Sequence, residues 1–195
     1  NYFLHQSDVM FDLKYNNMSI LNNESENWKV TLIDTGANSM TGGRLLRVKE
    51  YVGNDTFCMT YGDGVSDIDI NALIEFHKRQ KVTATLTAVQ EPGRFGTFML
   101  KGDQNKIESF REKPKDENTA WINGGFFVLE PAIFKYLKDD STIFERTPLE
   151  ALSKEKNLAA YKHEGFWMPM DTLRDKNVLE EMWSKGTPPW KKWDK

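Results

Sequence analysis

The sequence predicts an α/β fold with a mostly parallel central sheet. Apolar and β-branched residues fill two segments, 56–61 and 82–89, in the way that is typical of strands covered on both faces. Apolar residues at helical spacing precede each of them, over 42–52 and over about 70–80. Such alternation of strand and helix favours parallel strands joined by right-handed crossovers.

The segments nearer the start of the chain are also expected to be extended. Alternating apolar residues at 9–13 and the run "MSIL" at 18–21 indicate the short strands of a small ribbon. The run "WKVTLIDTG" at 28–36 predicts a further strand, directly before the first helix.

After Pro92 the pattern changes to shorter strands. They are expected at 97–101, 106–112 and 122–130, as a mixed-sheet extension that carries binding loops. A last strand is expected at 158–163.

Two helices are predicted in the last third of the chain. One is expected to begin with Thr147 as its N-cap, with Pro148 in the first turn and Glu150 completing a capping box. The other covers 173–186 and ends at Gly186.

The composition indicates one ordinary domain, and we expect residues 1–195 to form it. The 26 basic and 29 acidic residues give a net charge of −3, which argues against an extended nucleic-acid surface and against a membrane-binding basic face. The single cysteine, Cys58, is interpreted as a core residue, so no internal disulfide forms and a reducing, cytoplasmic compartment is expected. No apolar run approaches the length of a membrane span.

Carboxylates gather directly after the strand expected at 56–61, in the stretch "FCMTYGDGVSDIDI". Asp63 stands at the carboxyl end of that strand, the first place where a charged side chain can meet a ligand. Its glycine neighbours let a ligand approach the backbone. A structural alternative, a strand-to-helix turn in which Asp67 or Asp69 caps the next helix, explains Asp69 but does not explain Asp63.

A second carboxylate, Asp171, follows the apolar run "GFWMPM". Taken alone, it is better explained as an N-cap of the following helix. Taken together with Asp63, it suggests a pair of carboxylates that holds a hard divalent cation, because Mg²⁺ typically takes one or two protein carboxylates plus substrate phosphates.

Three further segments are candidate binding loops. "SFREKPKD" presents Glu112 and Lys113 from an extended segment before a proline, although such a charge cluster is usually a solvated edge. "INGGFF" places Gly124 and Gly125 inside a strand, which suggests a bulge or the close approach of a ligand. "DTGANSMTGGRL" at 34–45 is a glycine-rich loop that opens a helix, but it matches neither the P-loop nor the dinucleotide fingerprint.

Together the segments "SMTGGRL", "TYGDGVSDID", "PGRFG", "FREKPK", "INGGFFVL" and "GFWMPMDTLRDK", in this order, resemble the sugar-1-phosphate nucleotidyltransferases. The resemblance extends over essentially the whole chain. It implies a Rossmann-like α/β fold with a mixed, mostly parallel central sheet. It also implies, with CTP and α-D-glucose 1-phosphate as substrates, formation of CDP-glucose and pyrophosphate for bacterial O-antigen dideoxysugars, with Mg²⁺ as cofactor.

The resemblance further implies roles for individual residues. Asp63 and Asp171 would hold the metal, and Lys113 would contact the sugar phosphate. The glucose hydroxyls would be bound by Glu112 and Asn123, helped by Tyr61 and by the backbone at Gly96 and Gly124. The cytosine end would face Thr41, Gly42 and Arg44.

The chain departs from the family pattern at its start. The GGxGTR loop and the KPKP-type lysine segment of the family do not occur in the sequence. We therefore expect an amino-terminal truncation that removes central strands and impairs catalysis by this chain alone. Relatives form multimers, so a homo-oligomer is expected.

Two alternatives to the cytidylyltransferase interpretation stay open. A uridylyl- or thymidylyltransferase would use the same fold and would differ in the loop that faces the base. A non-catalytic domain that binds a sugar nucleotide would keep the sugar site without the reaction.

Overall fold

The computed structural model describes residues 6–23, 28–90, 97–100, 107–111 and 121–192, and it divides into two units. The first unit covers Asn1–Asp34 and the second Thr35–Lys195. Each is described separately. The single domain expected over the whole chain stays a prediction.

The first unit contains an antiparallel hairpin, formed by β1 (Ser7–Asp12) and β2 (Asn17–Asn23). Asp12 closes the turn, because its Oδ1 accepts hydrogen bonds from the backbone N–H groups of the second and third residues after it. The hairpin confirms the predicted ribbon.

The prediction of a strand at 28–36 is wrong, because those residues have no regular structure. Most of their apolar side chains are exposed, with 72% of Val30 and 92% of Leu32 accessible to solvent. A strand is stable only beside a hydrogen-bonded neighbour, and no strand in the described part of the chain pairs with this segment.

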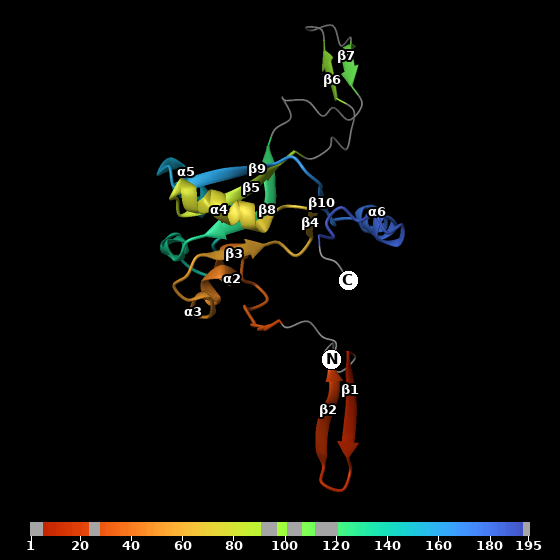
Figure 1. The fold of residues 1–195 in the computed structure, drawn as a ribbon. Coiled ribbons are helices and arrows are strands. Elements are labelled where there is room, and N and C mark those ends of the chain that lie inside the picture. Colours follow the sequence, from red (N-terminus) through yellow and green to blue (C-terminus); the bar gives the residue numbers. More distant parts are fainter. Residues whose placement is uncertain (1–5, 24–27, 91–96, 101–106, 112–120, 193–195) are drawn as a thin grey trace. The chain divides into compact units, whose positions relative to one another are not determined.

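The second unit is built on a four-stranded mixed sheet (Figure 1). The strand order is β3 (Phe57–Thr60), β8 (Ile122–Leu129), β5 (Ala84–Val89) and β9 (Leu158–His163). β8 runs antiparallel to both of its neighbours, whereas β5 and β9 are parallel. β3, β5 and β9 therefore point the same way, so their carboxyl ends lie at one end of the sheet, and the sheet is mixed, as predicted.

Apolar clusters cover both faces of this sheet. On one face lie the helices α2 (Thr41–Arg47) and α5 (Thr147–Lys154) and the 3₁₀ helix η2 (Pro131–Tyr136), and on the other lies α4 (Ile70–Gln80). Alternate residues of β8 supply the two clusters, because Phe127 and Leu129 join the first while Phe126 and Val128 join the second. β8 is therefore the core strand of a three-layer arrangement.

Four shorter strands and two further helices complete the described elements. The strands form two antiparallel pairs: β4 (Gly64–Ser66) with β10 (Trp167–Pro169), and β6 (Thr97–Leu100) with β7 (Ile107–Arg111). The helices are α3 (Lys49–Val52) and α6 (Leu173–Ser184).

The helix starts confirm one predicted cap and contradict another. Asp69 caps α4 as predicted, because its side chain accepts from Ala72 N at 3.0 Å. The capping box predicted at Thr147 is wrong: α5 already includes Thr147, and its N-cap, Arg146, makes no side-chain bond. The start of α5 is held without a capping box, because the fully buried Phe144 anchors the turn before the helix.

Cys58 is exposed, so the prediction of a core residue is also wrong. In the described sheet β3 is an edge strand, and its side chains alternate. Phe57 and Met59 pack against the core cluster, which turns Cys58 away from it.

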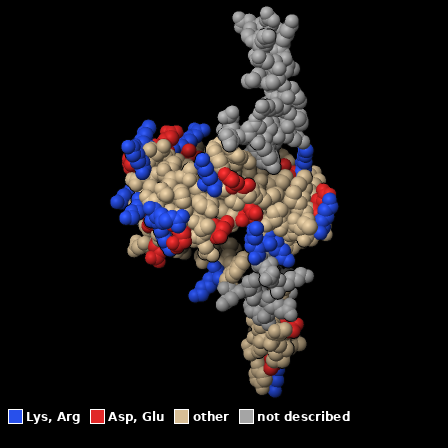
Figure 2. Space-filling view, turned by 45° about the horizontal axis from the view of Figure 1, so that its top comes forward, with Lys and Arg blue, Asp and Glu red and all other residues tan. Residues whose placement is uncertain are grey.

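Charge is mixed on the surface, as the composition suggests. Figure 2 shows basic and acidic side chains interspersed over the face that it draws. Among the described residues no helix combines the length and the hydropathy needed to cross a bilayer.

Candidate active site

The candidate site is built at the carboxyl end of β3. The chain leaves that strand through Tyr61 and reaches Asp63 before it enters β4. Tyr61 N donates to Gly125 O at 3.0 Å, which ties this exit to β8. Met170 N donates to Asp63 O at 2.8 Å, which ties it to the end of β10. Three segments far apart in the sequence therefore meet here.

The ladder between β4 and β10 brings the backbone segments of the two predicted carboxylates side by side. Gly64 pairs with Pro169, and the hydrogen bond from Met170 to Asp63 continues the ladder by one more step. Asp171 is the next residue after Met170. Asp63 and Asp171 therefore stand on neighbouring backbone segments, and both are exposed.

The three aspartates near the start of α4, Asp63, Asp67 and Asp69, have different surroundings in the structure. Asp69 is the helix cap, and Asp67 holds the turn before β10 by accepting from Phe166 N at 2.7 Å and contacting His163 Nε2 at 3.0 Å. For the exposed Asp63, no hydrogen bond or ion pair of the side chain is found within the described ranges. Asp63 is the one of the three whose position the fold itself does not explain.

The alternative role for Asp171, an N-cap, is wrong. The N-cap of α6 is Thr172, whose hydroxyl accepts from Asp175 N at 3.2 Å while the Asp175 carboxylate accepts from Thr172 N at 3.1 Å. The N-cap position of α6 is therefore occupied by Thr172, the residue after Asp171.

The glycine pair in β8 forms the predicted bulge. Pairing with β5 skips from Leu86, opposite Phe127, to Ala88, opposite Asn123. Gly125 has φ +79°, and a Cβ there would lie 2.7 Å from the Tyr61 ring. The bulge lets β8 approach Tyr61 closely, which a larger residue would prevent.

Trp167 fastens this bulge to β10, a contact that the sequence did not reveal. Its indole Nε1 donates to Gly124 O at 2.8 Å. The backbone of Gly124 thus lies beside the strand that leads to Asp171.

Tyr61 lies in a hydrogen-bonded cluster with two predicted substrate residues and one that was not predicted. Its hydroxyl donates to Glu145 Oε1 at 2.5 Å and accepts from Asn123 Nδ2 at 3.2 Å. Glu145 Oε2 accepts from Thr41 Oγ1 at 2.7 Å. Burial, followed by the bond to Glu145 and its negative charge, raises the pKa of the Tyr61 phenol, so Tyr61 remains a protonated donor at neutral pH. No spacing or motif in the sequence distinguishes Glu145.

The glycines at the start of α2 are used for packing. Gly42 N and Gly43 N donate to Thr142 O at 2.9 and 3.2 Å, and a Cβ on Gly43 would lie 2.4 Å from Asp140 O. These N–H groups are therefore engaged within the fold. Arg44 remains exposed, and its Nη1 donates to Thr35 Oγ1 at 2.7 Å.

Three predicted site residues, Gly96, Glu112 and Lys113, lie outside the described residues. No cluster of three or more potential metal ligands occurs in the ranges that the structure describes. The Asp63–Asp171 pair stays a predicted cation site.

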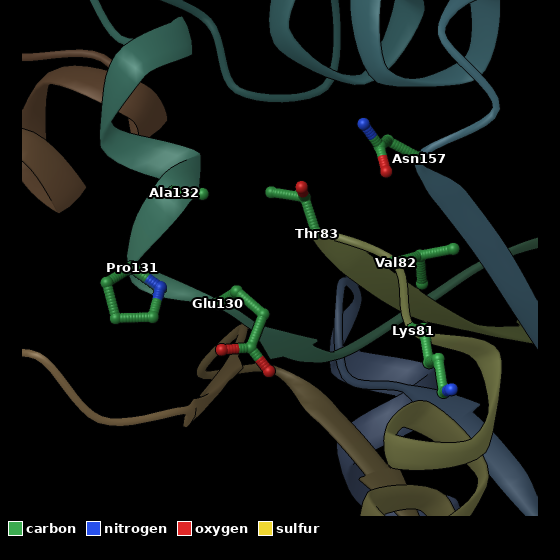
Figure 3. A pocket seen from close by; sticks show the side chains of 7 residues that line it. All are labelled: Lys81, Val82, Thr83, Glu130, Pro131, Ala132 and Asn157. Carbon is green, nitrogen blue, oxygen red and sulfur yellow. The ribbon is translucent and has the colours of Figure 1, made fainter.

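A pocket of about 430 Å³ lies at the opposite end of the sheet (Figure 3). Glu130, which follows β8, and Thr83, which precedes β5, contribute to its lining, with Lys81, Val82, Pro131, Ala132 and Asn157. It therefore sits at the amino ends of β5 and β9, away from Asp63, and we do not assign the reacting centre to it.

Comparisons with known proteins agree with the predicted family. The family model described as nucleotidyl transferase matches residues 9–175. Glucose-1-phosphate cytidylyltransferase of Salmonella typhimurium is 53% identical over 195 residues, which are 100% of this chain and 75% of that protein. A Bacillus subtilis protein named "Probable glucose-1-phosphate cytidylyltransferase" is 40% identical over 171 residues, which are 87% of this chain and 66% of that protein.

A solved structure of UDP-glucose pyrophosphorylase with UDP-glucose is similar at a TM-score of 0.55 and 16% identity. The similar region covers 78% of this chain and 64% of the pyrophosphorylase chain. At this sequence identity the similarity supports the fold alone. The family match, the relatives and the Rossmann-like fold lead to one conclusion: this chain belongs to the nucleotidyl transferase family.

Proposed function

We propose that this chain transfers a cytidylyl group from CTP to α-D-glucose 1-phosphate, giving CDP-glucose and pyrophosphate for O-antigen dideoxysugars. One structural observation carries the proposal: the ladder between β4 and β10 sets Asp63 and Asp171 on neighbouring segments at the carboxyl end of the sheet. The names of the Salmonella and Bacillus relatives support the choice of cytosine and glucose.

The reaction requires positioning more than covalent chemistry from the protein. A phosphate oxygen of glucose 1-phosphate forms a bond to the α-phosphorus of CTP. The bond from that phosphorus to the oxygen bridging to the β-phosphate breaks, and pyrophosphate leaves with the electron pair. Negative charge crowds at the α-phosphate, so aligned donors and neutralising charges supply the catalysis.

Members of this family generally use a divalent metal ion, and we propose Mg²⁺. Two exposed carboxylates on neighbouring segments fit this ion, which takes one or two carboxylates plus phosphate oxygens. Asp63 and Asp171 would hold it. When bound, the ion supplies charge neutralisation and a template for the phosphates.

The sugar end of the site is proposed around the bulge of β8. Asn123 and Tyr61 lie together there, and both have polar atoms that can bond glucose hydroxyls. Glu112 would bind further hydroxyls, Lys113 would contact the sugar phosphate, and the backbone at Gly96 and Gly124 would complete the pocket.

The base end is proposed at the start of α2. Thr41 and Arg44 are exposed there, and both can bond polar groups on the edge of a base. Gly42 would contribute by its lack of a side chain, since its N–H is bonded to Thr142. We also propose a cytoplasmic homo-oligomer built from one nucleotidyltransferase domain per chain, without a nucleic-acid partner.

The proposal is tested with protein expressed from its own gene, by measuring product formed from glucose 1-phosphate with CTP, UTP and dTTP in separate assays. We expect CDP-glucose with CTP as the preferred nucleotide. A preference for UTP or dTTP would establish the uridylyl- or thymidylyltransferase alternative. Calorimetric binding of CDP-glucose without pyrophosphate release from any nucleotide would establish the non-catalytic one.

A further inference from the structure

Glu145 connects two groups that the proposed function places at opposite ends of the substrates. Its Oε1 accepts from the hydroxyl of Tyr61 at 2.5 Å, and its Oε2 accepts from Thr41 Oγ1 at 2.7 Å. Tyr61 belongs to the sugar end and Thr41 to the base end. One partly buried carboxylate therefore touches both.

The hydroxyls on either side of Glu145 each accept one hydrogen bond within the protein, which leaves one lone pair of each oxygen for a substrate group. Thr41 Oγ1 accepts from Phe144 N at 2.9 Å, and the Tyr61 hydroxyl accepts from Asn123 Nδ2 at 3.2 Å. Each hydroxyl has one proton to donate, and each donates it to Glu145. A carboxylate can accept both protons, one on each oxygen, whereas a glutamine has only one acceptor oxygen.

Apolar residues on both sides of Glu145 anchor the segment that carries it. The preceding residue, Phe144, is fully buried and packs edge-on against Phe127 with ring centroids 5.4 Å apart. Pro148 is buried on the other side of Glu145. Apolar packing thus fixes the turn, and the charge of Glu145 is left for orienting the two hydroxyls.

We propose that Glu145 is a positioning residue that fixes Tyr61 and Thr41 together, so that the sugar and the nucleotide are bound in one relative orientation. This inference rests on the proposed transferase function. It assigns to Glu145 a role that neither its sequence context nor the family resemblance indicated.

The test compares Glu145→Gln with Tyr61→Phe and Thr41→Val in steady-state assays of cytidylyl transfer. Tyr61→Phe is expected to raise KM for glucose 1-phosphate and Thr41→Val to raise KM for CTP. Glu145→Gln is expected to raise both KM values by about tenfold, the size that follows from losing a hydrogen bond to a charged group. In the Tyr61→Phe background, Glu145→Gln is expected to have little further effect on KM for glucose 1-phosphate, because Glu145 acts on the sugar through Tyr61.

Glu155 offers a matched control. Its Oε2 accepts from the Tyr136 hydroxyl at 2.5 Å, the same kind of bond, at an exposed site outside the candidate active site. Glu155→Gln is expected to leave both KM values unchanged. NMR of labelled tyrosine gives a readout independent of turnover, because loss of the charged hydrogen-bond acceptor in Glu145→Gln should shift the ring resonances of Tyr61.

Unchanged KM values in Glu145→Gln, with an active wild type, would overturn the inference and leave the transferase function standing. A wild type that makes no CDP-glucose would instead overturn the proposed function. If Glu145→Gln does not yield folded protein, Glu145→Asp replaces it, because the shorter side chain keeps the charge but cannot reach both hydroxyls. Glu145→Asp with wild-type KM values would equally refute the role.

Discussion

The two ends of the central sheet use their polar side chains differently. At the amino end of β5, Glu130 accepts from Thr56 Oγ1 at 2.8 Å and contacts His77 Nε2 at 3.0 Å, while His77 Nδ1 bonds Thr85 Oγ1 at 2.8 Å. At the carboxyl end, Asp63 is exposed, and within the described residues its side chain has no hydrogen bond or ion pair.

This difference separates side chains that hold the fold from side chains that are available to a ligand. Buried polar groups are stable only when they are hydrogen-bonded, and His77, which is 1% exposed, has its partners within the protein. An exposed carboxylate at the carboxyl end of a strand does not need a protein partner and can meet a cation. Substitutions at the two ends should therefore affect different properties.

The largest expected effect is on activity at the carboxyl end. Asp63→Asn and Asp171→Asn should each lower kcat/KM for cytidylyl transfer by about 100-fold or more, because each would remove a proposed ligand of the cation that neutralises the phosphates. The Tm should stay close to that of the wild type, since both side chains are exposed. Steady-state kinetics and thermal unfolding measure the two properties. Large losses of Tm with activity retained would show that these aspartates support the fold instead.

At the amino end of the sheet we expect a loss of stability without a loss of activity. His77→Ala removes a buried ring with hydrogen bonds on both sides, so the free energy of unfolding should fall by about 2–4 kcal/mol. The kcat of the remaining folded protein should be unchanged. Urea unfolding and kinetics below the transition check this pair of outcomes, and a selective loss of kcat would contradict the comparison.

A smaller effect is expected where the fold and the site meet, at the bulge of β8. Gly125→Ala should lower the free energy of unfolding by about 2 kcal/mol, because a Cβ at positive φ would also collide with the Tyr61 ring. Gly186→Ala is the control, since Gly186 ends α6 with φ +72° and no atom lies within 4 Å of the added Cβ. That variant should lose only about 1 kcal/mol, the conformational part alone. Equal losses in the two variants would show that contact with Tyr61 is unimportant.

Much of the fold could be predicted from local patterns. The helix at 70–80 and the strand at 158–163 were predicted with the bounds that the structure shows, because apolar spacing and a capping aspartate mark them clearly. The strand expected at 28–36 failed because its apolar pattern says nothing of whether a pairing partner is present. The prediction that Cys58 is a core residue failed for a related reason, because the sequence does not show that β3 lies at an edge of the described sheet.

A candidate site residue could be singled out from the sequence where it lacked a local explanation. Asp63 stood out because no cap or turn accounted for it, and the structure leaves it exposed. Glu145 and Trp167 could not be found in this way, because their importance depends on partners such as Tyr61 and Gly124 that are distant in the sequence. For Gly42 the sequence suggested a ligand contact that the backbone does not leave open. Its motif suggested ligand binding, but its N–H donates to a carbonyl of the protein.

The central claim is that Asp63 and Asp171 bind one divalent cation together with the nucleotide. A crystal structure of the protein with Mn²⁺ and CDP-glucose tests it most directly, because the anomalous signal locates the ion. The account predicts one ion between the two side chains, with an oxygen of each at about 2.0–2.3 Å. An ion bound elsewhere, or bound by neither aspartate, would contradict it.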